Sequence, residues 1–280
     1  MGILSIQSQV VAGHVGNSAA VFALQRLGRE VWPIPTTLLS NHPGHGGAQG
    51  GPLPPALLQS LVDGLAVHGC FDRCEAVLSG YLATPANAAL IRGALAKARE
   101  KRKNCVYLCD PVLGDDGRTY VSADIVTAVH NLAAIADIMT PNAHELFLLA
   151  GHSLQNRHDA LRALRAVQAM GPRIVVLSSF TGTDTPANTL DVMAVDGPAA
   201  WRLSLPLLAE KFFGAGDVFA ALFLHFWLPN RDSAAALGKA CSALFGVLAH
   251  TPHGTGELAL IEAQDFILAP TRLFTAERQN

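Results

Sequence analysis

The stretch Phe212-Phe213-Gly214-Ala215-Gly216-Asp217 opens an apolar run, Val218–Trp227, that is typical of a helix. Two glycines flank one small residue, so the backbone can come very close to a ligand here. We expect the amides of Gly214, Ala215 and Gly216 in the first turn of that helix. Unsatisfied N–H donors and the helix dipole favour an anion at such a position.

Asp217 ends this motif. A carboxylate beside an anion site is badly placed to bind a phosphate, but it can take a proton from a hydroxyl group that attacks one. Phosphoryl transfer needs this combination of positioning, electrostatic stabilisation and a group that orients the nucleophile. The motif is not a P-loop, because no Gly-Lys-Ser/Thr follows the glycines. Taken alone, it also fits a tight turn before a helix.

Composition limits the class of protein. The chain has 280 residues, of which 50% are hydrophobic and 15% charged, so it can bury a full core. We find no repeat, low-complexity linker or composition break, and therefore expect a single domain over residues 1–280. The net charge of -2 indicates no surface for nucleic acid or an anionic membrane. No apolar run is long enough to span a membrane.

The five cysteines are odd in number, and the chain shows no signal peptide. Both observations favour reduced thiols and a cytoplasmic location. Two Cys-x-x-x-Cys spacings occur, but Cys105 and Cys109 lie in a strand-like run, so metal binding by them is disfavoured.

The N-terminal part predicts a parallel strand–helix–strand unit. Ile3–Gln9 reads as the first strand, and a glycine-rich turn follows it. Asn17 or Ser18 is the expected N-cap of a helix over Ala19–Leu27. Glu30–Thr37 reads as a second strand, at the edge of the sheet because it contains two prolines.

The rest of the chain alternates strands and helices, which predicts an α/β fold with a mostly parallel sheet. The predicted strands are Ala76–Leu82, Asn104–Cys109, Ala136–Met139 and Arg173–Leu177. The predicted helices are Pro55–His68, Pro85–Lys103, Ala123–Leu132, His158–Met170, Ser233–Ala249 and Glu262–Phe266. Leu190–Val195 and Ala200–Leu205 read as an antiparallel hairpin at the sheet edge.

Ser40–Pro55 is too rich in glycine and proline for a regular element. A loop of this length is usually either functional or disordered, and the sequence leaves both readings open. As a functional loop it would be a lid that excludes water. His42 and His45 could then contact a ligand, although a solvated histidine is the more common outcome.

Two residues are predicted at the ends of strands, where open α/β sheets bind ligands. Ser8 falls just past the first strand. Tyr81 lies in a Gly-Tyr turn at the carboxyl end of the stretch Ala76–Leu82, where it could stack on an aromatic ligand or simply pack on the surface.

Acidic residues follow the next strand. Asp110 and Asp115 are separated by a Pro/Gly bend and can converge on one cation. A sparse acidic loop suits Mg²⁺, which keeps water and phosphate oxygens as ligands. An Asp-rich surface turn is the alternative. Asn142 and Glu145 have the spacing of a capping box, and a role in orienting metal or water is possible in addition.

These motifs together resemble the pyridoxal kinases of the ribokinase-like superfamily. The match runs from Ser5-Ile6-Gln7-Ser8 to the last helix. The segments in register are Gly13-His14-Val15-Gly16-Asn17-Ser18-Ala19-Ala20, Ser40-Asn41-His42, Ser79-Gly80-Tyr81, Asp110-Pro111-Val112-Leu113-Gly114-Asp115, Thr140-Pro141-Asn142 with Glu145, and Gly214-Ala215-Gly216-Asp217. The last three occur across the superfamily, whereas the first three are specific for pyridoxal kinases.

The resemblance implies a role for each matching residue. Asp217 is similar to the general base for the 5′-hydroxymethyl group, and the Gly214, Ala215 and Gly216 amides to the anion hole. The implied substrate-binding residues are Ser8, His42, Pro43, Gly44, Tyr81 and Asp217. The implied ATP-binding residues are Asp110, Thr140, Asn142, Glu145, Ser178, Phe213, Gly214, Ala215 and Gly216. The implied metal ligands are Asp110, Asp115 and Glu145.

The resemblance also implies a three-layer α/β/α ribokinase-like fold and a homodimer. The implied activity converts pyridoxal to pyridoxal 5′-phosphate in vitamin B6 salvage. ATP would be the co-substrate, Mg²⁺ would be the metal ion, and a monovalent cation is possible in addition.

Two positions depart from the family. Pro43-Gly44 replaces a Thr and its neighbour in the substrate loop, and Ser178 stands where some bacterial relatives carry lysine. We expect altered affinity at both positions. The alternatives are a hydroxymethylpyrimidine kinase of the same superfamily and a non-catalytic pyridoxal-binding protein.

Overall fold

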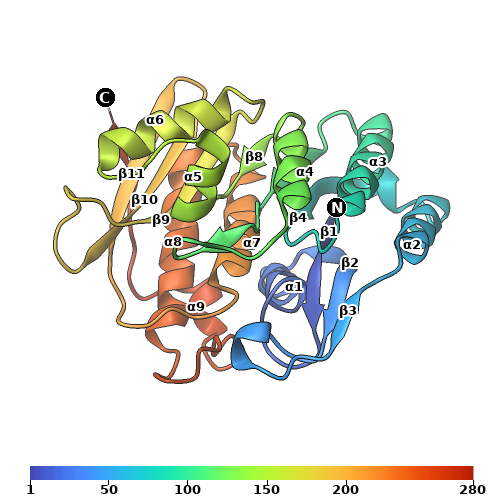
Figure 1. Cartoon of the computed structure of the whole chain (residues 1–280), viewed down its shortest axis with the longest axis horizontal. Helices are drawn as coiled ribbons and strands as arrows, with labels where there is room; N and C mark the ends of the chain where they lie inside the picture. Colours follow the sequence, from blue (N-terminus) through green and yellow to red (C-terminus); the bar gives the residue numbers. More distant parts are fainter. Residues whose placement is uncertain (280) are drawn as a thin grey trace.

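The core of the protein is one twisted sheet. In a computed structural model, which describes residues 1–279, ten strands form this sheet in the order β12-β11-β10-β9-β8-β5-β4-β1-β2-β3 (Figure 1). The strands are β1 (Gly2–Val10), β2 (Glu30–Leu39), β3 (Gly50–Pro52), β4 (Cys74–Ser79), β5 (Val106–Cys109), β8 (Ile138–Met139), β9 (Ile174–Phe180), β10 (Thr189–Asp196), β11 (Ala199–Pro206) and β12 (Glu277–Gln279). The strands from β2 to β9 are parallel, and the pairings at both edges are antiparallel. A separate ribbon pairs β6 (Gly114–Asp115) with β7 (Arg118–Thr119).

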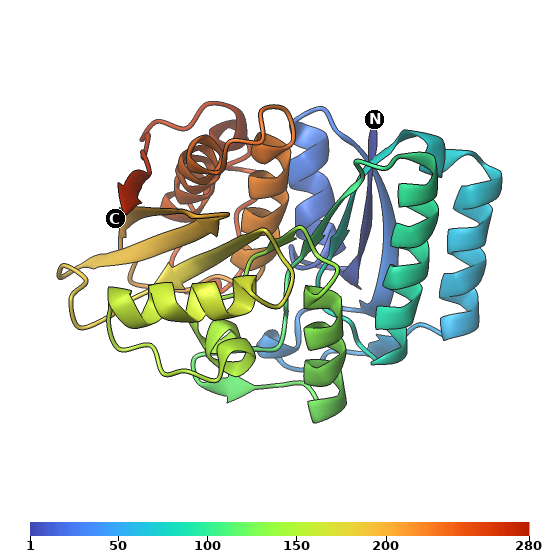
Figure 2. The same ribbon diagram turned by 90° about the horizontal axis from the view of Figure 1, so that it is seen from above.

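Helices cover both faces of the sheet, which gives three layers. One face carries α1 (Asn17–Arg26), α7 (Ala215–Trp227), α8 (Ser233–Ala249) and the short α9 (Asp265–Leu268). The other carries α2 (Pro55–Val67), α3 (Ala86–Lys101), α4 (Ala123–Ala133), α5 (Ala143–Ala150) and α6 (Arg157–Gln168). Figure 2 shows the blue and orange helices on one side and the cyan, green and yellow helices on the other. The predicted three-layer α/β fold is confirmed.

The strand sequences explain the two cores. Along β1, Ile3 packs into the core under α1 and α7, while its neighbour Leu4 packs into the core on the other face. Successive side chains of a strand point to opposite faces, so a strand covered on both sides must be apolar throughout. The helix over Ala86–Lys101 likewise buries Ile91 and Leu95 and leaves its basic end exposed.

The order of the strands fixes where a ligand can bind. From β1 the chain adds β2 on one side and then returns to add β4 on the other. In open α/β sheets, such a reversal opens a crevice outside the carboxyl ends of the strands. The ends of β1, β4, β5, β8 and β9 carry the polar residues that the sequence singled out.

Three local predictions, for the N-cap of α1 and for the positions of Ser8 and Ser178, were wrong. The N-cap of α1 is Gly16, and the Asn17 amide instead donates to the carbonyls of Gln7 and Ile34, because this buried amide needs partners. Ser8 and Ser178 lie inside β1 and β9, since both strands run further than their apolar runs.

The segment 40–55 contains a 3₁₀ turn, η1 (Pro43–His45), and the short strand β3, so it is not wholly irregular. β3 pairs with the end of β2, and β12 pairs with β11. Neither β2 nor the β10–β11 hairpin is therefore the outermost strand of the sheet.

Among the helices of residues 1–279, none is long and apolar enough to cross a membrane.

Candidate active site

The start of α7 forms the centre of the site. Gly214 is the N-cap residue, with φ 84°, and Asp217 lies in the first turn. A Cβ atom on Gly214 would lie 1.9 Å from the carbonyl oxygen of His14, so only glycine fits in this left-handed conformation. The glycine-rich turn after β1 therefore packs directly on the mouth of α7. The predicted juxtaposition of main-chain amides and a carboxylate at one helix start is present.

Asp217 faces the same turn. Burial raises the pKa of its carboxyl group to about 6, and a hydrogen bond from the backbone of Gly16 opposes the shift. A carboxylate with a pKa just below neutral is largely ionised at pH 7, yet it binds a proton more readily than a solvated aspartate does. This property suits a group that accepts a proton from an alcohol.

Asp110 follows β5 and is buried. The Thr140 hydroxyl, at the end of β8, donates to its Oδ1 at 2.7 Å. Burial, and then the nearby charge of Asp217, raises the pKa of Asp110, while the Thr140 hydrogen bond lowers it. The structure therefore brings Asp110, Thr140 and Asp217 together.

Glu145 completes the predicted capping box of α5. Its Oε2 accepts from the Asn142 amide at 2.8 Å, and its Oε1 accepts from the Leu113 amide at 3.0 Å. Burial and the charge of Asp110 raise the pKa of Glu145, and these two backbone donors lower it. The Asn142 side chain donates to the carbonyl of Gly114 at 2.8 Å, which ties α5 to the β6–β7 ribbon.

Asp115 lies apart from this buried pair of carboxylates. It is exposed in β6, and its Oδ1 accepts from the Asp116 amide at 2.8 Å. Its charge still acts on Glu145. Tyr120 flanks the same cluster, since partial burial of its hydroxyl group and then the charges of Glu145 and Asp115 raise its pKa. The sequence reading missed Tyr120, because a tyrosine after a surface turn carries no local signal of its neighbours.

The donor set fits a hard cation. In residues 1–279 no three His, Cys, Asp or Glu side chains are grouped as a preformed metal site. Burial and a neighbouring negative charge nevertheless raise both pKa values: Asp217 acts on Asp110, and Asp110 acts on Glu145. A cation would relieve this repulsion. Mg²⁺ is commonly held by one or two carboxylates together with phosphate oxygens and water, so this acidic set fits it.

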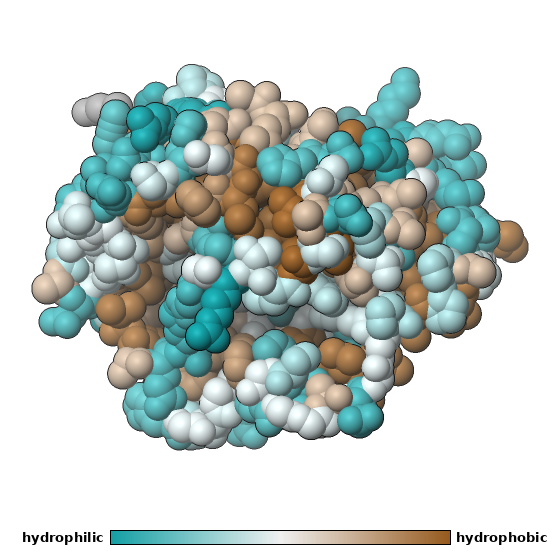
Figure 3. Space-filling model, in the orientation of Figure 1, coloured by the Kyte–Doolittle hydropathy of each residue, from teal (hydrophilic) through white to brown (hydrophobic). Residues whose placement is uncertain are grey.

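The residues predicted on the substrate side come from β1, β4 and the segment after β2. The Ser8 hydroxyl lies against Gly16, next to the turn that contacts Asp217. Tyr81 follows β4, and its carbonyl accepts from the Thr36 hydroxyl at 2.7 Å. The surface is hollowed near the centre of the face in Figure 3, with pale and hydrophilic residues around the hollow.

The segment 42–45 also packs at the N-terminal end of α7. The His42 ring lies on the Phe213 ring, with centroids 4.0 Å apart, and its Nδ1 accepts from the Gly44 amide at 3.1 Å. Burial, and then the charge of His45, lowers the pKa of His42, so this ring is neutral at pH 7. Pro43 and Gly44 form the exposed 3₁₀ turn above Phe213. Phe213 was predicted beside ATP; in the structure its ring contacts the histidines of this segment.

Ser178 lies near the end of β9, and its amide donates to the Pro141 carbonyl at 3.0 Å. This bond places Ser178 beside the loop that carries Thr140 and Asn142. Sequence reasoning missed Glu257, which contacts both His14 and His45. No local motif surrounds it, and its partners lie far away along the chain.

Comparison with known proteins gives the same family. A sequence profile of the phosphomethylpyrimidine kinase family matches residues 55–256. Pyridoxal kinase PdxY of Corynebacterium diphtheriae is 39% identical over 281 residues, which cover 99% of each chain. Pyridoxal kinase PdxY of Deinococcus radiodurans is 41% identical over 285 residues, covering 99% of this chain and 96% of the relative.

A solved structure extends this similarity to three dimensions. The pyridoxal kinase of Leishmania donovani in complex with ADP and pyridoxamine is 30% identical, with a TM-score of 0.89, covering 100% of this chain and 99% of that one. The fold, the kinase motifs and these relatives agree over nearly the whole length of the chain. The chain therefore belongs to the pyridoxal kinase PdxY family of ATP-dependent phosphotransferases.

Proposed function

We propose that the protein transfers the γ-phosphate of ATP to the 5′-hydroxymethyl group of pyridoxal, giving pyridoxal 5′-phosphate for vitamin B6 salvage. The observation that carries the proposal is the arrangement of residues at the N-terminal end of α7, here called the mouth of α7. There, the Asp217 carboxylate and the amides that follow Gly214 meet at the crevice of the sheet. The full-length relatives with this printed activity support pyridoxal as the acceptor.

Asp217 accepts the proton of the attacking hydroxyl group. Its pKa of about 6 leaves it mostly ionised at neutral pH, so the proton has an acceptor within the buried site. The Gly214, Ala215 and Gly216 amides stabilise negative charge on the phosphoryl group as it moves. Both contributions come from the first turn of one helix, so their relative position is rigid.

The acidic cluster serves the nucleotide side. Asp110, Glu145 and Asp115 would hold Mg²⁺, with Glu145 acting through water because both of its oxygens already accept backbone N–H groups. The bound ion would neutralise phosphate charge. The Thr140 hydroxyl and the Asn142 backbone amide fix the positions of the Asp110 and Glu145 carboxylates, to which they donate hydrogen bonds. Ser178 lies beside them at the end of β9 and would contact the nucleotide, and Phe213 would lie between the nucleotide and the segment 42–45.

The other half of the crevice takes the vitamin. Ser8 would hydrogen-bond the pyridine ring, and Tyr81 would stack on it. His42 would lie near the ring, with Pro43 and Gly44 in the turn above the site. The protein would work as one domain and as a homodimer in the cytoplasm, with a monovalent cation as an optional addition.

A hydroxymethylpyrimidine is the second candidate acceptor, because the matching profile is that of phosphomethylpyrimidine kinases. The profile begins at residue 55 and so includes Asp110, Glu145 and Asp217. It excludes Ser8 in β1, the following turn with Gly13 and His14, and the segment 42–45. The catalytic half is therefore common to both candidates, and the first 54 residues decide between them.

A product assay tests the proposal. The protein is incubated with Mg·ATP and either pyridoxal, pyridoxine, pyridoxamine or hydroxymethylpyrimidine, and phosphorylated products are separated and quantified. We expect pyridoxal 5′-phosphate as the main product. Phosphorylation of the pyrimidine alone would establish the second candidate, and pyridoxal binding without ATP consumption would indicate a non-catalytic binding protein.

A further inference from the structure

Glu257 joins three segments that meet at the mouth of α7. It lies near the C-terminal end of the chain, in the loop between α8 and α9, and its side chain is 27% exposed. Its Oε1 accepts from the His14 amide at 2.5 Å, in the turn after β1. Its Oε2 lies 2.8 Å from Nε2 of His45, in the turn η1. In Figure 1 the red loop of this region lies beside the blue segment that contains η1.

The backbone next to Glu257 holds the third segment. The Gly256 carbonyl accepts from the Phe213 amide at 2.9 Å. The Phe213 ring in turn contacts both histidines of η1, at 4.0 Å from His42 and 5.1 Å from His45 between ring centroids. The segment 42–45 is therefore held against residue 213 from one side and against Glu257 from the other.

Through His14, Glu257 holds the turn after β1, which packs against the start of α7. The His14 carbonyl lies against Gly214, and Gly16 of the same turn binds the Asp217 carboxylate. At Gly13, which has φ +98°, a Cβ atom would lie 2.6 Å from Oε1 of Glu257, so the turn leaves space for this carboxylate. Displacement of Glu257 would free the turn on which Gly214 and Asp217 rest.

We infer that Glu257 is a positioning residue for phosphoryl transfer. It holds the turn after β1 and the segment 42–45 in the closed arrangement around the substrate side of the site, without touching the substrate. This inference rests on the proposed function. The carboxylate binds one segment with each oxygen, so both contacts depend on a single side chain. Closure of such a segment orders the substrate and excludes water from the phosphoryl group.

Steady-state kinetics of E257A and E257Q test this role. We expect the KM for pyridoxal to rise about tenfold in E257A, the effect of losing one charge-assisted hydrogen bond. The KM for ATP should stay within about twofold, and pyridoxal-independent ATP hydrolysis should increase. E257Q keeps an acceptor for the His14 amide and should show a smaller rise. A purely structural role would instead lower the amount of active protein and leave both KM values unchanged.

Three further variants complete the test. H45A removes the contact between Glu257 and η1, together with the ring contact of His45 with Phe213, and it keeps the contact with His14. The double variant H45A/E257A should show less than the sum of the two single effects, because both changes break the same Glu257–His45 contact. E262A removes an exposed carboxylate further along the same segment and serves as the control. If E257A does not fold, H45A and E257Q still report on the contact with η1. Pyridoxal and ATP constants for E257Q and H45A equal to those of E262A would overturn the inference.

Amide hydrogen exchange separates this inference from the proposed function. In the ligand-free protein, E257Q should exchange faster than the wild type over residues 40–50, whatever the acceptor substrate is. Wild-type protein that phosphorylates no B6 vitamer would disprove the function alone. Unchanged exchange over residues 40–50 in an active enzyme would disprove the role of Glu257 alone.

Discussion

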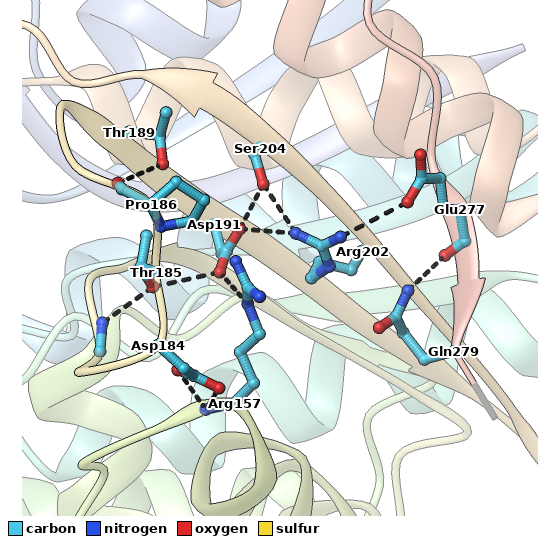
Figure 4. A network of polar contacts seen from close by, with 11 residues as sticks. Arg157, Asp184, Thr185, Pro186, Thr189, Asp191, Arg202, Ser204, Glu277 and Gln279 are labelled. Carbon is cyan, nitrogen blue, oxygen red and sulfur yellow. Dashed lines mark hydrogen bonds and ion pairs between the residues drawn. The ribbon is translucent and has the colours of Figure 1, made fainter.

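Two sites in this protein hold buried or half-buried carboxylates, and the sites differ in whether a basic side chain balances the negative charge. At the carboxyl ends of the strands, Asp110, Glu145 and Asp217 gather without a basic partner: no lysine or arginine in residues 1–279 forms an ion pair with them. Between β10 and β11, Asp191 is fully buried and bound by Arg157 and Arg202 (Figure 4).

The pKa values follow this difference. Burial raises the pKa of Asp110 and of Asp217, and the hydrogen bonds from Thr140 and Gly16 offset this shift only in part. Burial would also raise the pKa of Asp191, but hydrogen bonds from Arg157, Ser204 and Arg202 outweigh it and lower the pKa. Asp191, the paired carboxylate, stabilises the fold. Asp110, Glu145 and Asp217, the unpaired cluster, carry a negative charge that only a ligand or a cation can balance. Unbalanced charge of this kind marks a functional site.

The largest effect is expected at the unpaired cluster, from Asp217→Asn. The variant lacks the proton acceptor, so kcat should fall by roughly 10²- to 10⁴-fold. The melting temperature should not fall, because the change removes a buried charge that has no basic partner. Turnover with saturating pyridoxal and ATP, together with thermal unfolding, checks both points. Asp124→Asn, on the exposed first turn of α4, is the control. Near-normal turnover in Asp217→Asn would refute the assignment of the base.

The opposite result is expected at the paired site, from Asp191→Ala. The variant leaves Arg157 and Arg202 without their carboxylate, and such a loss destabilises a protein by about 3 kcal/mol or more. Thr185 and Ser204 also lose an acceptor, at 3.2 and 2.5 Å. Urea unfolding should show a lower midpoint, while kcat at saturating substrates stays within about threefold. An unchanged midpoint would mean that the network contributes little to stability.

The pH dependence of stability sharpens the comparison, because the two sites should respond with opposite sign. Folding raises the pKa of Asp217 from 3.8 to about 6, so ionisation of this group costs stability as the pH rises through that interval. Folding lowers the pKa of Asp191, so its contribution is present above pH 3.8 and is lost as the pH falls below it.

Urea unfolding from pH 3.5 to 7 measures this contrast. The stability of Asp217→Asn relative to the wild type should increase between about pH 4 and pH 6 and then level off. The deficit of Asp191→Ala should be constant over that range and shrink only below about pH 4. Parallel profiles for the two variants would contradict the difference between the sites.

Most residues of the unpaired cluster could be predicted from the sequence, whereas no residue of the network around Asp191 could. Asp110, Asn142 and Asp217 each follow a strand or begin a helix, and these local signals are readable in a short window. Most helices and strands were predicted for the same reason. The short strands β3, β6, β7 and β12 were not predicted, and the last helix, predicted over Glu262–Phe266, spans Asp265–Leu268 in the structure. Asp191 gave no such signal, because it reads as one polar residue in an alternating strand.

What the sequence could not give depends on contacts between distant segments. Glu257 and His14 are 243 positions apart, and only the folded chain brings them together. The same holds for β12, whose pairing with β11 joins the C-terminal residues to the sheet. Tyr120 is likewise placed beside the acidic residues by the β6–β7 ribbon, which is too short to be recognised as a hairpin in the sequence.

The smallest effect is expected from adding a cation beside the unpaired cluster. Ser178 stands where some bacterial relatives carry lysine, and its amide binds the Pro141 carbonyl beside Thr140. Near the end of β9 the pairing with β10 shifts register between Leu177 and Phe180, and within this irregular stretch Ser178 is half-buried whereas Ser179 is exposed. Ser178→Lys should lower the KM for ATP about threefold, through a partly solvated charge that attracts the phosphates.

Ser179→Lys is the matched control, because it adds the same charge at the neighbouring, exposed position. The gain in Ser178→Lys should shrink as the salt concentration rises, since screening weakens exposed charges, and the KM for pyridoxal should not change. An equal effect of the two lysines would mean that net charge, rather than position, determines nucleotide affinity. No effect of Ser178→Lys would mean that the metal already balances the acidic cluster and the phosphates, and that a second cation is not needed at the end of β9.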